Sequence, residues 1–581
     1  MFKTKSVTKY ISALIFTFSI SLINAQDAGN AQDTGNAQDT GSFTGGLQTS
    51  ANAFMRDSLI GAFNIPQYDQ ELFGSQTWLD LGYTQYGFDI GIRFDVFNNS
   101  NLRNPNDSYT HEEIGRWHIA KKVGKLDIRV GYIYDQIGSG IIYRAFEERP
   151  LLIDNALVGA RLIYDLGENW QIKAFSGRQR SRQREVSQTF QGSVRGSSLE
   201  GFIDLSREAT DEKQGRLLTF APGIAVVNRT VSDETMNQVL NEIAGYTTQD
   251  QVLPKYNTYA FTFFNTTSFG PFNWYVETAF KSGEAFFDPF KSQANGILGK
   301  FVKDTGSVLY TSLSFAKSGF GITLEGKRTE NFDFRTNPRL GFNDGVINYI
   351  PPMNRNNTYR LNARYSPATQ LLSEQAYQVD VNYRWNKKLS TNINFSNITN
   401  LDGQKLYQEV YTAIQYKFNR KSKLIGGLQL LNYNQDVYEG KPGVPIVETV
   451  VPYLDYLYKI NRKTSIRTEL QYMMIGDDKK ADAKQDYGDW IFAQVEFAVA
   501  PHWSFVVSDM FNVDPGKSSP KDEDGEKLSL HYPRFDIYYT HKANRFSLSY
   551  IKQVEGIVCT GGICRLEPAF SGVNFTAQSS F

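Results

Sequence analysis

The sequence predicts an all-β fold: a transmembrane antiparallel β-barrel of the outer-membrane type, with long outer loops and short periplasmic turns. Three observations predict it. Segments of about ten residues alternate apolar with polar side chains, short and long connections alternate between them, and the chain ends on an aromatic residue after a strand-like segment. With both termini in the periplasm the strand number is even, and we expect about 24 strands, to within roughly four.

The alternation is clear in two segments. Between residues 465 and 474, one face carries Ile466, Thr468, Leu470, Tyr472 and Met474, and the other carries Ser465, Arg467, Glu469 and Gln471. Between residues 377 and 385, Tyr, Val and Trp alternate with Gln378, Asp380, Asn382 and Arg384. A soluble sandwich alternates in the same way. However, these segments are long enough for a tilted strand to cross a bilayer, and many carry an aromatic residue near their ends, which favours a barrel.

The connections between strands fall into two classes. Short turns are expected at residues 167–169, 270–272, 386–389, 419–423, 461–464, 501–502 and 542–544. Long polar connections lie between them, for example at residues 98–115, 232–255, 284–304, 436–443, 476–488 and 514–527. Residues 232–244 are expected to form a short helix within such a loop, with Ser232 as its N-cap. Short turns on the periplasmic side and long loops outside are typical of outer-membrane barrels.

The two ends of the chain carry export and insertion features. A basic start and a short apolar run predict a cleaved signal peptide at residues 1–25, and the Gly-, Asn- and Gln-rich repeat QDAGNAQDTGNAQDTGS predicts a disordered leader at residues 26–42. The barrel would then span residues 43–581. The last strand presents an alternating set that is typical of the signal recognised by the outer-membrane insertion machinery: Val573, Phe575, Ala577, Ser579 and Phe581.

Composition supports this class and excludes others. There are 61 Lys and Arg residues against 61 Asp and Glu, so no net charge favours nucleic-acid binding. The mean hydropathy of -0.41 argues against a helical membrane protein, whereas 41 Phe and 33 Tyr suit strands and membrane interfaces. The expected surroundings are the lipid and lipopolysaccharide of the outer membrane of a Gram-negative bacterium.

Two stretches carry a family resemblance. Residues 138–162 read GSGIIYRAFEERPLLIDNALVGARL, and residues 555–573 read EGIVCTGGICRLEPAFSGV. Together they resemble an uncharacterised family of large outer-membrane β-barrel proteins from Bacteroidota, and Gln26 directly after the cleavage site is also typical of that phylum. The resemblance implies the fold and the location. It implies no activity, cofactor or catalytic residue.

Two segments are candidates for folding into the lumen. The first follows a strand that ends near Ile137 and carries five charges: Arg144, Glu147, Glu148, Arg149 and Asp154. One interpretation is a loop that folds back and pairs with lumen residues such as Asp380, Arg467 and Glu469; the alternative is a solvated surface loop held by its own ion pairs. The second, residues 331–374, is too long for a simple loop and only partly strand-like, around residues 359–365.

Three smaller features suggest specific chemistry. Cys559 and Cys564 are the only cysteines, and in an oxidising compartment they are expected to form a disulfide. Four arginines alternate along one segment and are candidate contacts for anions or lipopolysaccharide phosphate, unless they are a solvated strand extension: Arg178, Arg180, Arg182 and Arg184. The acidic residues between Asp522 and Glu526 suggest a calcium loop, but the ligand spacing is not met.

The sequence does not favour an enzyme. None of the five histidines has a metal-ligand spacing or lies beside a nucleophile motif: His111, His118, His502, His531 and His541. Two functions remain. The first is a porin-like channel or transporter for polar solutes, with a lumen narrowed by inward segments; a barrel of about two dozen strands favours it, because side chains alone cannot fill such a lumen. The second is a non-catalytic scaffold in an assembly, secretion or surface-lipoprotein complex, whose partners would be lipoproteins or other barrels.

Overall fold

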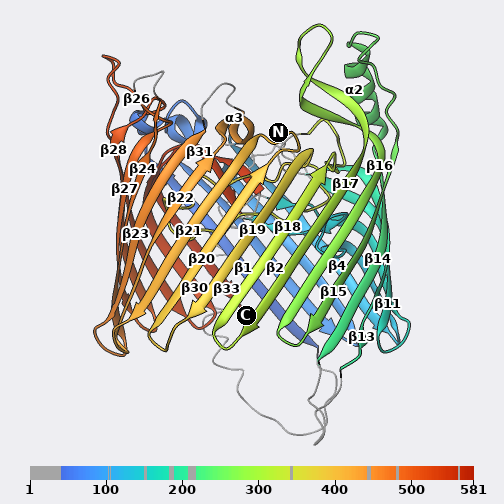
Figure 1. Cartoon of the computed structure of the whole chain (residues 1–581), viewed down its shortest axis with the longest axis horizontal. Helices are drawn as coiled ribbons and strands as arrows, with labels where there is room; N and C mark the ends of the chain where they lie inside the picture. The colour runs from blue at the N-terminus through green and yellow to red at the C-terminus, as the bar shows by residue number, and fades with distance from the viewer. Residues whose placement is uncertain are drawn as a thin grey trace, which may run out of the picture.

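The chain folds into a closed antiparallel barrel of 24 spanning strands (Figure 1). The computed structural model describes residues 41–581 except 103, 105, 150–152, 182–188, 207–216, 341–343, 441–445, 479–482 and 561–562. The predicted signal peptide and almost all of the predicted leader therefore lie outside the described residues. The first strand begins at Ser42.

Every spanning strand pairs with its neighbours in sequence order. The first twelve, in which β13 (Ile203–Asp204) continues β12, are β1 (Ser42–Phe54), β2 (Phe73–Gln85), β3 (Phe88–Ser100), β4 (Tyr109–Val123), β5 (Leu126–Ile133), β10 (Leu157–Asp165), β11 (Trp170–Ser181), β12 (Thr189–Gly201), β14 (Leu218–Thr230), β15 (Asn257–Phe269), β16 (Phe272–Ser292) and β17 (Leu298–Lys317). The other twelve are β18 (Phe320–Glu330), β19 (Ser373–Arg384), β20 (Leu389–Thr399), β21 (Lys405–Lys417), β22 (Ser422–Tyr433), β23 (Val447–Lys459), β24 (Thr464–Ile475), β27 (Gly488–Val499), β28 (Trp503–Pro515), β29 (His531–His541), β30 (Asn544–Gln553) and β33 (Phe570–Ser580).

The barrel closes where its first and last strands meet. β1 pairs with β33 from Gly46 opposite Ser580 to Phe54 opposite Gly572. Beyond this register, Gly45 N–H donates to the carbonyl of Phe581 at 2.7 Å, and Phe581 N–H donates to the carbonyl of Gly45 at 3.0 Å. The Phe581 ring lies directly over Gly45, in the space that a Cβ would need. The terminal aromatic residue is thus part of the closing seam.

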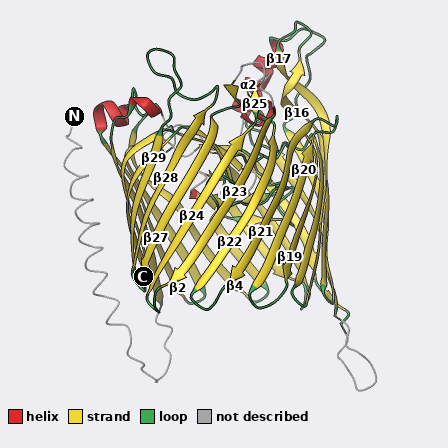
Figure 2. Ribbon diagram, turned by 60° about the vertical axis from the view of Figure 1, so that its left-hand side comes forward, coloured by secondary structure: helices red, strands yellow, loops and turns green. Residues whose placement is uncertain are grey.

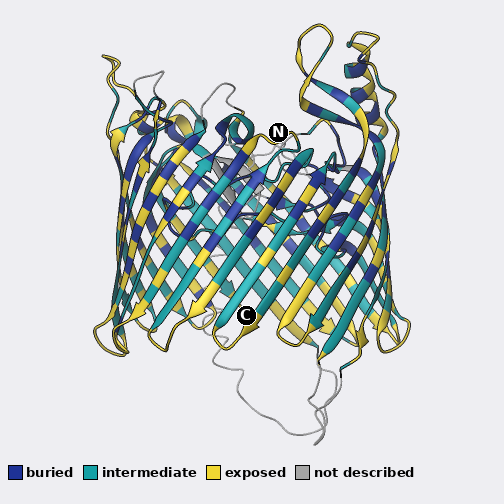
Figure 3. Cartoon of the chain, in the orientation of Figure 1, coloured by how far each residue is buried: buried dark blue, intermediate teal, exposed yellow. Residues whose placement is uncertain are grey.

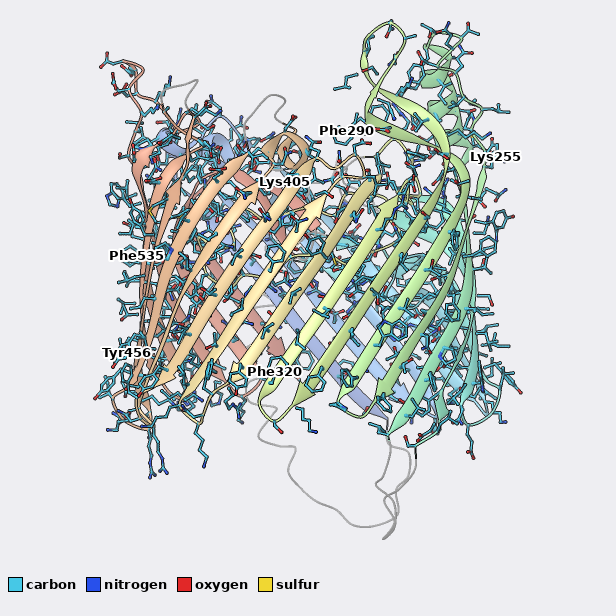
Figure 4. The ribbon with its side chains drawn as sticks, in the orientation of Figure 1. Lys255, Phe290, Phe320, Lys405, Tyr456 and Phe535 are labelled. Atoms are coloured by element: carbon cyan, nitrogen blue, oxygen red, sulfur yellow. The ribbon has the colours of Figure 1, made fainter. Side chains whose placement is uncertain are left out.

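The predicted faces of the strands are found in the structure. Leu470 points out and is 46% exposed, whereas the neighbouring Gln471 points into the barrel and is 2% exposed. Outward aromatic side chains such as Tyr456 and Phe535 point away from the wall (Figure 4). The outer surface is therefore apolar, as contact with lipid requires. No helix within the described residues is long and apolar enough to span a membrane.

The two ends of the barrel differ. All seven predicted short turns lie at one end, which we call the turn end, together with β1's first residue and the C-terminus. The end of β13 at Asp204 and the start of β14 at Leu218 also lie there. The long connections lie at the opposite end, which we call the loop end. Residues 284–304, predicted as a loop, instead continue β16 and β17 beyond the barrel because Ala285 pairs with Lys303 and Phe287 with Phe301.

The loop end carries short elements as well. They are η3 (Ser58–Ile60), η4 (Gln67–Glu71), β6 (Asp135–Gln136), β7 (Arg144–Ala145), β8 (Glu147–Glu148), β9 (Ile153–Asp154), α2 (Asp233–Ala244), α3 (Gln435–Glu439), β25 (Asp477–Asp478), β26 (Ala483–Lys484), β31 (Gly556–Thr560) and β32 (Ile563–Glu567). The predicted helix is α2, and Ser232 caps it because its Oγ accepts from Thr235 N–H. The extended β16–β17 hairpin and α2 stand above the barrel (Figure 2) and pack through Val239, Ile243, Ala285 and Phe301.

The assigned faces predict how charge affects insertion. Leu470→Lys places an ammonium group in lipid near the middle of β24, which costs about 2–4 kcal/mol at a bilayer midplane. Gln471→Lys places it in the lumen beside Glu469. We expect Leu470→Lys to lower the folded fraction in native membranes much more than Gln471→Lys, measured as heat-modifiable mobility on gels. Equal losses would show that the faces are assigned wrongly.

Candidate functional site

The burial of inward side chains changes along the barrel axis. In β19, which runs from the loop end to the turn end, the inward residues Glu374, Ala376 and Gln378 are buried, whereas Asn382 and Arg384 are exposed. β23 shows the same change after Asp455. Figure 3 shows that buried residues gather in the half of the barrel near the loop end. Something other than the wall therefore covers the inward side chains in that half.

Two chain segments cover them, and we call them together the plug: residues 134–156 between β5 and β10, and residues 331–372 between β18 and β19. Apolar residues of both segments share one buried cluster with inward residues of most strands from β5 to β29. The two segments also contact each other. Arg144 N–H donates to the Ile347 carbonyl at 2.8 Å, and Tyr349 N–H donates to the Gly140 carbonyl at 2.9 Å.

Charges fix the first plug segment to the wall. Glu147 accepts from Arg93 of β3 at 2.5 Å and from Arg116 of β4 at 3.0 Å. Arg149 pairs with Glu147 at 3.1 Å and with Asp80 of β2 at 3.3 Å. Because Arg93 is almost fully buried, its charge must be compensated, and the Glu147 carboxylate contributes to that together with Asp95. Glu147 therefore binds the guanidinium groups of Arg93 and Arg116 on the wall and that of Arg149 on the plug.

Asp154 and the turn at Ser139 add two further attachments. Asp154 accepts from Arg180 of β11 at 2.5 Å and from the Tyr134 hydroxyl at 2.9 Å. Across the lumen, Ser139 donates from both its N–H and its hydroxyl to Glu277 of β16, at 2.9 and 2.6 Å. The first segment is thus held by strands on separate parts of the wall.

The second plug segment is held by hydrogen bonds from uncharged donors, most of which meet a carboxylate. Asn357 donates to Glu409 of β21 at 3.0 Å, and the Tyr359 hydroxyl donates to Asp455 of β23 at 3.3 Å. Leu361 N–H donates to Gln471 of β24 at 2.7 Å, and the Tyr365 hydroxyl donates to Asp486 at 2.7 Å. The strand-like pattern around residues 359–365 does not produce a strand, because the backbone turns on itself there: Ala363 N–H donates to the Tyr359 carbonyl at 3.0 Å, and Arg364 N–H donates to the Leu361 carbonyl at 3.2 Å.

The predicted charge partners of the first segment differ from those in the structure. Arg467 pairs with Asp455 and Glu469 at 2.9 and 3.0 Å, on the part of the wall that holds the second segment. Asp380 accepts from Asn392 and Asn394 at 3.0 and 3.2 Å. Of the five predicted plug charges, Glu148 is exposed, and Arg144 lies over the Tyr349 ring at 4.2 Å.

Sequence reasoning missed the wall residues that hold the plug, of which Arg93, Asp80 and Arg116 are the most connected. One signal was available. Oppositely charged residues two positions apart lie on the same face of a strand, and Arg93 with Asp95, Arg467 with Glu469 and Arg534 with Asp536 all follow this spacing. Each of these pairs faces the lumen.

Arg178 and Arg180 do not share a face. The pairing of β11 with β12 shifts between Arg178 and Arg180, which indicates a bulge. Arg178 is consequently exposed and donates to the Phe190 carbonyl, whereas Arg180 turns inward to the plug. These two residues therefore do not form one row, and their role as anion contacts stays a prediction. Arg182 and Arg184 lie outside the described residues.

The remaining predicted residues are placed as follows. Val573, Phe575, Ala577 and Ser579 lie on β33 and Phe581 follows it, and their role as an insertion signal stays a prediction. Asp522 accepts from Asp524 N–H and Glu526 N–H, so its carboxylate closes a turn. Within the described part of the chain, no three His, Cys, Asp or Glu side chains are arranged to hold a metal ion. The absence of catalytic activity also stays a prediction.

The comparisons with known proteins give a family and an architecture. A family described as a family of unknown function (DUF6029) matches residues 7–581. The chain belongs to this family. No curated protein matches. Similar solved structures include the translocation pore of the P pilus usher PapC, with 10% identity and a TM-score of 0.39 over 93% of this chain and 99% of that chain.

Two further similar structures are of proteins from Acinetobacter baumannii. The siderophore receptor PirA has 8% identity and a TM-score of 0.38 over 94% of this chain and 81% of that chain. OccAB4 has 11% identity and a TM-score of 0.31 over 71% of this chain and 97% of that chain. Scores and identities in this range assign no function to the DUF6029 chain. Its architecture follows from its own closed sheet.

The ion pairs of Glu147 predict an acid-sensitive attachment of the plug. Burial raises the pKa of Glu147, but the charges of Arg93, Arg149 and Arg116 outweigh it and hold the pKa below its usual range. A lowered carboxylate pKa stabilises the attached plug above the unfolded value of about 4.3, and this stabilisation is lost as the pH falls through the lowered pKa. Acidification below pH ~4 should therefore loosen residues 134–149, which hydrogen–deuterium exchange measures.

Glu147→Gln should loosen the same residues at neutral pH. Removing one charge from a buried set leaves the other charges uncompensated, at a cost of about 2–5 kcal/mol. The control is Glu148→Gln, which changes an exposed neighbour of the same length and charge. Faster exchange in both variants, or in neither, would contradict the role given to Glu147.

The cysteine pair gives a separate prediction. In the β31–β32 hairpin Cys559 lies directly opposite Cys564. Opposed residues of an antiparallel pair have Cα atoms about 4.5–5.5 Å apart, which lies within the range for disulfides. We expect both cysteines of the protein from native membranes to resist alkylation until a reductant is added, which mass spectrometry detects. Full alkylation without reductant would exclude the bridge.

Proposed function

We propose that the protein is a channel or transporter for polar solutes in the outer membrane of a Gram-negative bacterium. Its lumen would be closed near the loop end by the plug and hollow at the turn end, which faces the periplasm. The observation that carries this proposal is the change in burial along single strands, from the buried Glu374 to the exposed Arg384 of β19. A barrel of 24 strands leaves space beyond what wall side chains fill, and here a polar half-lumen remains.

Three cavities that reach the turn end support the proposal, and the first of them extends along β30 from Arg545 to Gln553. The largest measures about 790 Å³ and is lined by Arg467, Gln494, Ser508 and Arg534, among others. The second measures about 650 Å³, and the third measures about 350 Å³ and is lined by Arg116 and His118. Their linings are mainly polar or charged, as in the lumen of a barrel that passes hydrophilic solutes.

The alternative is a non-catalytic scaffold that binds lipoproteins or other barrels of a surface complex. The observation that favours it is the projecting β16–β17 hairpin, on which Phe290 is 56% exposed and Leu298 is 63% exposed (Figure 4). Exposed apolar side chains above the barrel offer a contact for a partner. Isolation from native membranes in mild detergent distinguishes the two functions. A stoichiometric partner that is lost when residues 289–299 are replaced by a turn would favour the scaffold.

Shortening the second plug segment tests the transport function. The ends of the second plug segment lie side by side, because Asn331 N–H donates to the Leu372 carbonyl and Phe332 N–H to the Leu371 carbonyl, both at 2.8 Å. A turn of about four residues can therefore replace residues 333–370. We expect wild-type protein to conduct weakly in planar bilayers, and the shortened variant to conduct at least about tenfold more, because a wide aqueous lumen opens.

The matched control replaces residues 289–299 at the tip of the β16–β17 hairpin, a loop-end change that leaves the plug in place. Its conductance should equal that of the wild type. Heat-modifiable mobility on gels verifies that each variant forms a barrel. If the plug-shortened barrel is folded and conducts no better than the wild type, the transport function is refuted.

A further inference from the structure

One part of the turn end is strongly basic. Four consecutive short turns, β17–β18, β19–β20, β21–β22 and β23–β24, lie at residues 316–321, 382–390, 415–424 and 457–465. These stretches contain no Asp or Glu and carry eleven cationic side chains, which we call the basic rim: Lys317, Arg384, Lys387, Lys388, Lys417, Arg420, Lys421, Lys423, Lys459, Arg462 and Lys463. For a chain without net charge, this is a marked local excess.

The basic rim continues into the cavity of about 650 Å³. Four rim residues line this cavity, namely Arg384, Lys387, Lys388 and Lys417, and Arg355 of the plug is a fifth cation. No Asp or Glu is among the lining residues, whereas hydrogen-bonding groups of Thr391, Asn392 and Gln415 are. Five positive charges thus surround one hollow without a lining carboxylate, and such a concave arrangement concentrates the electrostatic potential.

Arg355 distinguishes this cavity from a solvated basic surface. Its guanidinium group lies over the Tyr411 ring at 3.9 Å and donates to the amide oxygen of Asn392, while its buried Nε has no hydrogen-bond partner. Tyr411 and Asn392 therefore fix the side chain without neutralising it. Among the described residues, none of the five lining cations forms an ion pair with a carboxylate.

The neighbouring cavity of about 790 Å³ shows the contrast. The plug residue Thr358 lines both cavities, so they lie on either side of the same part of the plug. In the larger cavity, Arg467 pairs with Glu469 and Arg534 pairs with Asp536, and all four residues line it. Three carboxylates, Glu469, Glu496 and Asp536, thus line the larger cavity beside its arginines, whereas no carboxylate lines the smaller cavity. A bound anion would compensate the positive charges of the smaller cavity.

We propose that this cavity binds a small polar solute with two or more phosphate or carboxylate groups. A guanidinium group and several ammonium groups suit such oxyanions, and the volume is within the range of about 300–1,000 Å³ that is usual for small-molecule sites. The proposal rests on the proposed function, because it names the class of solute that the lumen receives. The basic rim would attract the same anions from the periplasm, and Arg355 would place them against the plug.

The test is a binding measurement that does not depend on conductance. The full chain is placed in phosphatidylcholine nanodiscs and titrated with inorganic pyrophosphate at low ionic strength by calorimetry. We expect pyrophosphate to bind, citrate to compete and sucrose to have no effect. The double variant Arg355→Gln/Lys388→Gln should bind pyrophosphate at least about tenfold more weakly. Lys388→Gln alone changes an exposed turn residue, keeps the fold, and should still weaken binding measurably.

The control is Lys421→Gln/Lys463→Gln, which removes two rim charges that do not line the cavity, and its affinity should stay within about twofold of the wild type. Absence of pyrophosphate binding, or an equal loss in the control, overturns the site. Displacement of pyrophosphate by phosphatidylglycerol in the disc would mean that lipid headgroups occupy it and also overturns the assignment. Binding without conductance in any plug variant refutes only the transport function, and conductance without binding refutes only the site.

Discussion

The structure depends on one constraint: every backbone polar group that crosses the membrane must be paired. A sheet meets this requirement in lipid only by closing on itself. Here β1 closes against β33, and the bonds between Gly45 and Phe581 extend the closure to the last residue. Closure with 24 strands has a geometric consequence, since it leaves a lumen that the wall cannot fill. The plug fills the part of this lumen near the loop end, and the rest of the lumen is a polar hollow.

The plug combines two kinds of contact that have different physical roles. Its apolar residues, such as Ile141, Phe334 and Met353, are fully buried and provide the non-directional stabilisation of a core. Its polar contacts are directional and place particular residues against particular strands. Burying Arg93 or Arg180 without a partner would be costly, so Glu147 and Asp154 can occupy only positions that meet those guanidinium groups. The charged network therefore specifies where the first segment lies, and the apolar cluster stabilises it there.

The sequence predicted what local periodicity determines. The strand number, the outward Leu470 and inward Gln471, and the Ser232-capped α2 are all visible in patterns a few residues long. The inward turn of Arg180 was not predictable from β11, because the extra residue of the bulge lies in the paired strand β12, between Phe190 and Ser193. The extension of β16 and β17 was missed because its polar residues resemble a loop.

The candidate site was predictable only in part. Alternation shows that Arg467, Glu469 and Asp380 face the lumen, but it contains no information about which inward segment lies opposite them. That depends on the order of strands around the barrel and on the path of the plug across it. The charge of the basic rim could be counted in the sequence. Its relation to Arg355 could not be predicted. Arg355 and Arg384 are 29 residues apart in the sequence, and they line the same cavity only in the folded barrel.

Four attachments of the second plug segment occur in chain order, whereas Gln429 of β22 donates to the Asn362 carbonyl outside that order. Asn357, Tyr359, Leu361 and Tyr365 bond to β21, β23, β24 and then Asp486, so successive residues meet successive parts of the wall. A mechanical force applied at one end of this segment would load these bonds one after another and not all together. At each step the force then has to break only a single hydrogen bond. A modest pull from the turn end would peel the segment off the wall, while uniform pressure from either end would meet the resistance of the whole set.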